Sequence, residues 1–304
     1  MAGRKEKRAI VVGSRGQDGR LLTALLAKEG WRVRGVTRGG PVDVSSARSV
    51  ERLVRDFAPD EVYYLAAVHR NSEERRPDTA EELEAGYDVH VRGLLNFLEA
   101  LRLHRPKARL FYASSSRVFG RARGTQTEKT PPSPVDVYGL TKAWGQELCA
   151  RYRKLGLFAS AGILYNHQSH LQSERHLSRK IVLGALRALR GESKPVELGD
   201  MKTKTDRGWA PDYADAMRRI LRCREPGDFI VATGELHSAG ELAREVCARL
   251  GLDHRKVFRE KKGLVRSKDA PLRGDASKLR RLTGWRPTPF SRFVDLLIAA
   301  EAGR

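Results

Sequence analysis

The chain has 304 residues and a mass of 34.1 kDa, enough for one large domain or for a domain with an appended lobe. Hydrophobic residues make up 40% of it, and no apolar run approaches the roughly 20 residues of a membrane span, so we expect no membrane partner. The formal net charge is +21, but the basic residues are spread over nearly the whole chain without a zinc-finger or RNA-recognition motif. This favours a solvated basic surface, or a pocket for an anionic substrate, over nucleic-acid binding.

The termini and cysteines predict a cytoplasmic protein. The basic segment 1–8 runs directly into an apolar stretch, with no signal-peptide apolar region or cleavage site after it. Cys149, Cys223 and Cys247 are widely spaced and show no metal-ligand pairing, so we expect no metal site. Such cysteines suit a reducing compartment.

Apolar runs and amphipathic segments alternate along the first part of the chain. Strands are expected at 8–13, 32–37, 61–66, 108–114 and 158–165. Helices are expected at 18–30, 46–57, 78–104, 136–155 and 174–191. This alternation predicts an α/β protein with a Rossmann-type, doubly wound parallel sheet that helices cover on both faces.

A glycine-rich turn joins the first expected strand to the first expected helix. The run 8–13 is typical of a buried strand, and leucines recur at helical spacing over 21–26. Gly13, Gly16 and Gly19 therefore fall on a strand–turn–helix, where bare backbone can approach a pyrophosphate at the helix N-terminus. In this context the glycines predict a dinucleotide site. Asp18 is also expected to cap the first helix.

Tyr138 and Lys142 lie four residues apart in an expected helix, and hence on one face of it. The ammonium of Lys142 can lower the pKa of the phenol towards neutrality, because an opposite charge favours the phenolate. Such a phenol can exchange a proton with a sugar or alcohol oxygen. A hydroxyl from the upstream run 114–116 can hold the same oxygen. With a nicotinamide bound alongside, these residues predict a hydride-transfer site.

After about residue 166 the pattern is less regular. Strands are expected at 195–199 and 229–233, and helices at 211–224, 238–250, 275–283 and 290–302. We interpret 1–166 as an NAD(P)-binding Rossmann domain. Residues 167–304 are interpreted as mainly a smaller, spatially separate substrate-binding lobe, with some return of the chain to the Rossmann domain.

On these residues the chain resembles the extended short-chain dehydrogenase/reductases, and within that group the GDP-mannose 4,6-dehydratase family. The glycine turn and the Tyr138/Lys142 pair match the superfamily, while Asn166-His167 and 232–238 match the family. Other matching segments run along almost the whole chain: 16–19, 62–67, 162–165, 178–181, 210–217, 274–278 and 284–287.

The resemblance implies an enzyme that binds NADP(H) and a GDP-sugar, oxidises the sugar at C4, eliminates water across C5 and C6, and returns the hydride to C6. It implies Tyr138 as the C4 base, Lys142 as its tuner and ribose ligand, and Ser115 as the hydroxyl on the C4 oxygen. The cofactor-binding residues that it implies are Gly13, Arg15, Gly16, Gln17, Asp18, Arg38, Asp43, Val44, Leu65, Ala66, Ala67, Tyr138, Lys142 and His167. The substrate-binding residues that it implies are Ser116, Arg117, Asn166, Lys180 and Arg207.

Cofactor choice depends on Arg38, which follows the second expected strand. An acidic residue there favours NAD, whereas a basic one accommodates the 2′-phosphate. We therefore expect NADP, with NAD as the alternative. The segment after Arg38 is shorter than the family's loop, which reaches a neighbouring subunit. A homodimer or a higher homo-oligomer is expected, but the family's tetramer stays open.

Arg117 stands where the family carries the glutamate that removes the C5 proton. A guanidinium cannot act as a base at physiological pH, because its pKa stays above about 12. Elimination by the usual route is therefore in question, whereas oxidation at C4 is not. Further departures from the family pattern are Gly39, Gln172, Thr205 and Arg207.

Three functions stay open at this point. The first is a GDP-mannose 4,6-dehydratase-like enzyme whose elimination base has moved or whose reaction stops short. The second is a C4 reductase or epimerase, which needs only Ser115, Tyr138, Lys142 and the cofactor. The third is a catalytically silent protein that senses or scaffolds nucleotide sugars, which the intact Tyr138/Lys142 pair argues against. Two further residues, His69 and His90, have no partner identifiable from the sequence and are interpreted as structural or peripheral.

Overall fold

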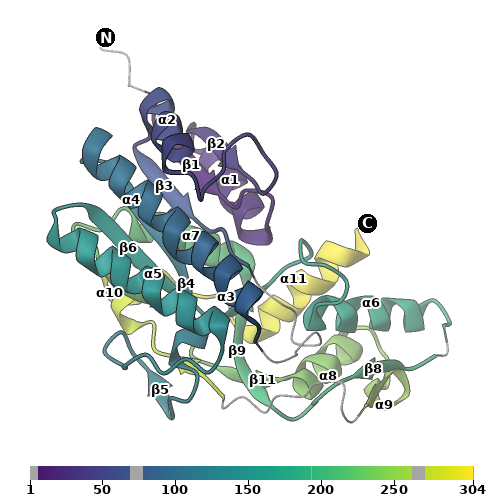
Figure 1. Ribbon diagram of the computed structural model, residues 1–304. Helices are drawn as coiled ribbons and strands as arrows, with labels where there is room; N and C mark the ends of the chain where they lie inside the picture. Colours follow the sequence, from purple (N-terminus) through teal and green to yellow (C-terminus); the bar gives the residue numbers. More distant parts are fainter. Residues whose placement is uncertain (1–5, 69–77, 193, 262–270, 304) are drawn as a thin grey trace.

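A parallel six-stranded sheet forms the centre of the protein in a computed structural model that describes residues 6–68, 78–192, 194–261 and 271–303 (Figure 1). The strand order is β10-β6-β4-β3-β1-β2, and every neighbouring pair is parallel. The strands are β1 (Arg8–Val12), β2 (Arg32–Val36), β3 (Glu61–Tyr64), β4 (Arg109–Ser115), β6 (Phe158–Leu164) and β10 (Asp228–Val231). The expected Rossmann-type fold is confirmed.

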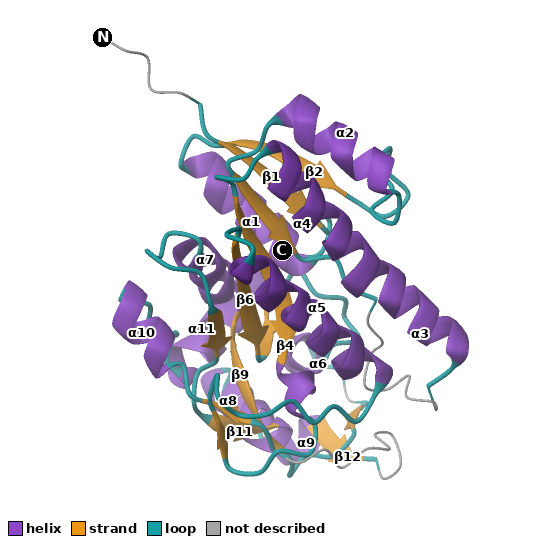
Figure 2. Ribbon diagram, turned by 60° about the vertical axis from the view of Figure 1, so that its left-hand side comes forward, coloured by secondary structure: helices purple, strands orange, loops and turns teal. Residues whose placement is uncertain are grey.

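Helices cover both faces of this sheet, because its central strands are apolar on both sides. Figure 2 shows α7 and α10 on one side of the sheet and α2 and α4 on the other. The first core packs the sheet against α1 (Gln17–Lys28), α7 (Ala210–Ile220) and α10 (Ser277–Thr283). The second packs it against α2 (Ala47–Phe57), α4 (Gly93–His104) and α5 (Val137–Lys154).

The strand order reverses direction between β1 and β3. From β1 the chain moves outward to β2, and from β3 it moves the other way to β4 and β6. In open α/β sheets, ligands bind outside the carboxyl ends of the strands at such a switch point. The glycine turn after β1 and the segment 65–67 after β3 both lie there.

A third core gathers the later elements α6 (Leu177–Leu189), α8 (Ala239–Arg249) and α11 (Phe290–Ala302), at the lower right of Figure 1. Beside them a three-stranded sheet has the order β11-β9-β7. Its strands are β7 (Asn166–Gln168), β9 (Lys204–Trp209) and β11 (Leu236–Ser238). Shorter elements are β5 (Thr125–Gln126) with β13 (Arg273–Gly274), β8 (Val196–Leu198) with β12 (Phe258–Glu260), and α9 (His254–Val257).

The strand expected at 229–233 is present as β10, the edge strand of the main sheet, and α7 packs on α1, so the chain after residue 166 partly returns to the Rossmann core. Two expected helices differ from the structure. The helix expected at 78–104 is α3 (Ala80–Tyr87) and α4, joined by a π-helical turn, Asp88–Arg92. The helix expected at 211–224 ends at Ile220. No helix in the described part of the chain is long and apolar enough to cross a membrane.

Candidate active site

The glycine turn lies directly against the segment that follows β3. Gly13 has φ +88°, and a Cβ built there would meet the backbone nitrogen of Ala66 at 2.9 Å and the carbonyl carbon of Leu65 at 3.0 Å. At Gly19 a Cβ would lie 2.3 Å from the carbonyl oxygen of Gly13, so only glycine lets α1 begin so close to β1. The structure therefore brings Gly13, Leu65 and Ala66 together at the switch point, in a cradle that suits a pyrophosphate.

The start of α1 is connected to β7 by a cluster of polar contacts. Nε2 of His167 lies 3.0 and 2.9 Å from the two carboxylate oxygens of Asp18, and its Nδ1 lies 2.7 Å from the carbonyl oxygen of Tyr165. Gln17 donates to the carbonyl oxygen of His167 at 3.3 Å and accepts from the hydroxyl of Ser169 at 2.8 Å. Asp18 was expected to cap the first helix, but Gly16 is the N-cap residue and no side chain caps it.

Electrostatics make Asp18 and His167 a charged pair. Burial opposes the charge on His167, but the neighbouring carboxylate outweighs it and raises the pKa of the imidazole. Burial likewise opposes the charge on Asp18, and the imidazolium outweighs it, so the pKa of the carboxyl is lowered. The ring of His167 also stacks on Tyr213, with centroids 4.3 Å apart. Both pKa shifts favour the ion pair, which lies at the first turn of α1, next to the glycine turn.

Ser115, Tyr138 and Lys142 meet where β4 ends against α5. Tyr138 is hydrogen-bonded to the side chain of Ser115. Nζ of Lys142 lies 5.7 Å from the centroid of the Tyr138 ring and donates a 2.8 Å hydrogen bond to the carbonyl oxygen of Ala113. Lys142 is only 1% exposed. The helical spacing and the strand end thus place hydroxyl, phenol and amine around one point.

Lys142 was expected to lower the pKa of the Tyr138 phenol, and this expectation is wrong for the protein without ligands. Burial raises the pKa of Tyr138 to about 12, and the hydrogen bond with Ser115 only partly opposes this. Burial also lowers the pKa of Lys142 to about 7, against the attraction of Asp18. The amine donates to the carbonyl oxygen of Ala113 and lies over the Tyr138 ring. The expected activation of the phenol therefore does not come from the lysine charge in this state.

The structure places His90 against Tyr138, a contact that the sequence did not reveal. His90 is fully buried in the π-helical turn, its Nε2 accepts from the backbone N–H of Val68 at 3.0 Å, and its Nδ1 lies 2.8 Å from Oγ1 of Thr141. Because Nε2 accepts, Nδ1 must carry the proton and donate. The ring meets Tyr138 edge-on, with centroids 5.5 Å apart. The only sequence signal was a histidine between two valines, Val89 and Val91, in an expected helix. His69, interpreted in the same way, lies outside the described residues.

Arg117 forms an ion pair with Asp136, and both side chains are about one quarter exposed. Asp136 is the N-cap of α5, where its other oxygen accepts from the backbone N–H of Gly139 at 2.8 Å. The hydroxyl of Ser115 in turn accepts from the backbone N–H of Arg117 at 3.2 Å. The arginine thus connects the turn after β4 to the start of the helix that carries Tyr138.

The other cofactor candidates are less enclosed. Arg15, Arg38 and Ala67 are exposed. Asp43 and Val44 lie in the loop between β2 and α2, where Asp43 N–H donates to Ser49 at 3.2 Å and the carbonyl oxygen of Val44 accepts from Asn96 at 2.8 Å.

The substrate candidates fall on two groups of elements. Ser116 follows Ser115 in a 3-10 turn and is buried, whereas Lys180 lines a pocket of about 240 Å³ on α6 with Arg175 and Arg187. Asn166 on β7 pairs with Arg207 on β9. Arg207 is 4% exposed, and its guanidinium donates to the carbonyl oxygen of His237 at 3.2 Å. Burial lowers the pKa of this guanidinium to about 10. Within the described residues, no group of three His, Cys, Asp or Glu side chains could hold a metal ion.

Comparison with known proteins identifies the lineage of this site. A family model described as GDP-mannose 4,6 dehydratase matches residues 40–296. GDP-mannose 4,6 dehydratase 1 of Arabidopsis thaliana is 31% identical over 96% of this chain and 89% of its own length. GDP-mannose 4,6-dehydratase of Vibrio cholerae is 28% identical over 93% of this chain and 90% of its own length.

Solved structures agree on the fold. RMD from Pseudomonas aeruginosa, complexed with NADPH, superposes with a TM-score of 0.83, at 22% identity over 98% of this chain and 99% of that one. UDP-glucose 4-epimerase of Thermus thermophilus, in complex with NAD, gives 0.75 at 25% identity over 97% of this chain and 99% of that one. The resemblance inferred from the glycine turn and the Tyr138/Lys142 pair is confirmed, and the chain belongs to the GDP-mannose 4,6-dehydratase family.

Proposed function

We propose that this protein is an NADP(H)-dependent enzyme that oxidises a GDP-linked hexose at C4 to a 4-keto sugar, as a GDP-mannose 4,6-dehydratase does. The observation that carries this proposal is the meeting of Ser115, Tyr138 and Lys142 at the end of β4, beside the glycine turn. Membership of the family and its relatives' names support GDP-mannose as the substrate. The chemistry of the site agrees, because a phenol and a hydroxyl can share one sugar oxygen.

The residues have distinct roles in this reaction. Tyr138 takes the proton of the C4 hydroxyl while Ser115 holds its oxygen, and NADP, when bound, supplies the acceptor for the C4 hydride. The glycine turn holds the pyrophosphate on bare backbone N–H groups. Lys142 holds the ribose hydroxyls of the cofactor. Removing a positioned acid or base costs roughly 10²–10⁴-fold in rate.

The steps after oxidation depend on residue 117. Dehydration needs a base that removes the C5 proton, so that hydroxide leaves C6 and the hydride returns to C6. Arg117 cannot accept that proton, and its ion pair with Asp136 commits it to the helix start. This favours, as a second candidate, a C4 reductase or epimerase that uses the same oxidation without loss of water.

The same proposal assigns roles to the two parts of the chain. Residues 1–166 would bind the dinucleotide and 167–304 mainly the GDP-sugar, with Asn166, Lys180 and Arg207 among its ligands. Arg38 beside the ribose would favour NADP over NAD. We propose a cytoplasmic homo-oligomer, a dimer or larger.

A product analysis tests the function. The protein is incubated with GDP-mannose and catalytic NADP, and the nucleotide sugars are followed by mass spectrometry. Loss of one water identifies dehydration, unchanged mass with altered stereochemistry identifies epimerisation, and a change of two hydrogens identifies net redox. The Tyr138→Phe variant should lose at least about 100-fold in turnover and keep its NADP affinity, because the glycine turn is intact. Turnover within tenfold of wild type would remove Tyr138 from the chemistry.

A further inference from the structure

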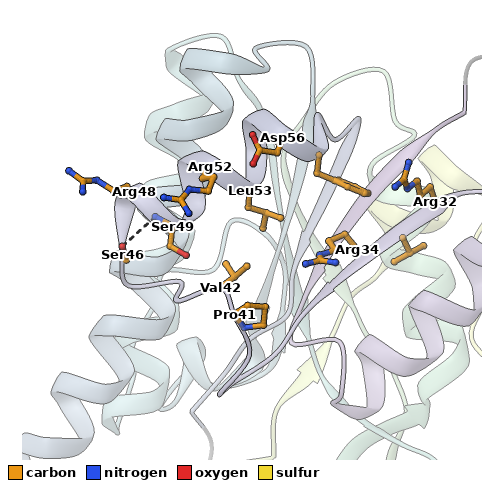
Figure 3. A pocket seen from close by; sticks show the side chains of 12 residues that line it. Arg32, Arg34, Pro41, Val42, Ser46, Arg48, Ser49, Arg52, Leu53 and Asp56 are labelled. Carbon is orange, nitrogen blue, oxygen red and sulfur yellow. Dashed lines mark hydrogen bonds between the residues drawn. The ribbon is translucent and has the colours of Figure 1, made fainter.

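A basic groove of about 620 Å³ lies between the edge strand β2 and the helix α2, away from the switch point (Figure 3). Figure 3 shows Arg34 on the strand side, Arg52 and Ser49 on the helix side, and Leu53 with Val42 between them. Its volume falls within the roughly 300–1,000 Å³ typical of small-molecule sites. No residue of the proposed hydride-transfer group lines it.

The charges around the groove are strongly unbalanced. Four arginines line it, at positions 32, 34, 48 and 52, against one carboxylate, Asp56. Arg32 is 3.8 Å from Glu6, but for Arg34, Arg48 and Arg52 no ion pair is found in the described part of the chain. Figure 3 shows the side chains of Arg34 and Arg52 on opposite sides of the groove, whereas that of Arg48 points away from it. Like charges on one groove repel each other, and an anion between them relieves that repulsion.

The end of the groove at the start of α2 adds neutral donors. Ser46 is the N-cap residue, and its Oγ accepts from the backbone N–H of Ser49 at 3.3 Å. Both serines line the groove. A helix N-terminus presents unpaired N–H groups and a partial positive charge, and no acidic residue occupies the first turn of α2 to neutralise it.

The floor of the groove is apolar. Pro41, Val42 and Leu53 line it together with the ring of Phe57. A bare inorganic ion would use only the rim, whereas a ligand that also carries a flat or apolar part would use both. We propose that this groove binds a phosphate-bearing small molecule of the mononucleotide class, its phosphates on Arg34 and Arg52 and its ring on Val42 and Leu53.

This site is separate from the dinucleotide site but adjoins it. The crevice for the dinucleotide lies at the carboxyl ends of β1 and β3, whereas the groove lies along the outer side of β2. The loop 41–46 contributes Pro41, Val42 and Ser46 to the groove, and it also carries Asp43, which the family resemblance implies as a cofactor-binding residue. A ligand in the groove would therefore contact the same loop that is implied to contact the cofactor.

Binding of AMP and of tripolyphosphate, measured by calorimetry on the full chain with saturating NADPH and GDP present, tests the proposal. We expect both probes to bind, and Arg52→Ala and Arg34→Ala each to weaken binding about tenfold, the value of one charge-assisted hydrogen bond. Arg55→Ala is the matched control, because Arg55 is an exposed arginine on the same helix that does not line the groove. Asp56→Asn should tighten binding about threefold by removing the opposing charge.

The outcomes separate the alternatives. If Arg55→Ala weakens binding as much as Arg52→Ala, the affinity belongs to diffuse surface charge and the proposal is wrong. If AMP binds when the titration is repeated without NADPH but not with it, the groove is part of the cofactor site and the proposal is wrong. A single-stranded RNA 12-mer that binds through Arg34 and Arg52, while AMP does not, would reassign the groove to nucleic acid. Because binding is measured without turnover, a failed dehydratase assay leaves this test unaffected.

Discussion

Nε2 of His167 lies 2.9 Å from the carboxylate of Asp18, across 149 positions of sequence. This contact joins the first turn of α1 to β7, which immediately follows the strand β6 of the main sheet. It thereby fixes the glycine turn relative to the residues after 166 that are proposed to hold substrate. Because both groups are charged and largely enclosed, the contact has a definite dependence on pH.

His167→Gln should remove that dependence. The pKa of His167 is raised on folding, so its stabilising contribution is complete below about pH 6.5 and is lost as pH rises through the folded value. The pKa of Asp18 is lowered, so its contribution is present above about pH 3.9 and is lost on further acidification. At pH 6 the variant should be about 2 kcal/mol less stable, and the gap should shrink by pH 9.

Thermal unfolding of both proteins from pH 5.5 to 9 measures this. His104→Gln is the control, since His104 forms an exposed pair with Glu51 at 2.9 Å, and exposed pairs contribute little. A gap between wild type and His167→Gln that stays constant over the range would show that His167 contributes by stacking on Tyr213 and not by charge.

Lys142→Met should stabilise the protein and abolish turnover. The folded pKa of about 7 lies below the unfolded value of about 10.4, so the unfolded chain binds the extra proton between them and stability rises with pH over that window. Methionine removes the buried charge, although Ala113 loses its donor. We expect a gain of about 1 to 2 kcal/mol at pH 7 that disappears by pH 10.

Chemical denaturation at pH 7 and pH 10 measures the gain, with Lys154→Met, an exposed lysine of the same helix, as the control. A large loss of stability on Lys142→Met at pH 7 would mean that the ammonium is well paired in the folded protein, contrary to its contacts with one carbonyl and two aromatic rings.

The sequence predicted the features that depend on the spacing of apolar residues and on local turn residues. The six strands of the main sheet, the glycine turn, and the Tyr138/Lys142 face could be read because alternation, bare glycines and helical spacing are local signals. The strands β7, β9 and β11 could not, since β7 and β11 have three residues each, β9 is largely polar, and all three are held by partners distant in sequence. For the same reason the Asp18–His167 pair and the π-helical turn at His90 emerged only from tertiary structure.

His90 is expected to position Tyr138 without taking part in proton transfer. His90→Ala should lower kcat about tenfold and leave the shape of the pH–rate profile unchanged, because both ring nitrogens are engaged, one by Val68 N–H and the other by Thr141, and the ring meets Tyr138 through its edge. His90→Gln, which can accept from Val68 and donate to Thr141, should restore most of the rate. A shifted pH profile in either variant would instead make His90 a proton-transfer group.

Arg117 gives the sharpest test of how far the reaction goes. If no other residue has taken over as the C5 base, wild-type protein given GDP-mannose in deuterated water should form or epimerise a 4-keto sugar without deuterium at C5 and without a C6 methyl group in the NMR spectrum. Arg117→Glu alone would place a second carboxylate beside Asp136, and like charges at that distance raise the pKa of one of them. Arg117→Glu combined with Asp136→Asn avoids this, because asparagine still caps α5. The double variant should then lose water slowly, with Asp136→Asn alone as its control. A C6 methyl in the wild-type product, formed at a rate that the double variant does not change, would show that another residue removes the C5 proton and that Arg117 serves only to hold the start of the Tyr138 helix.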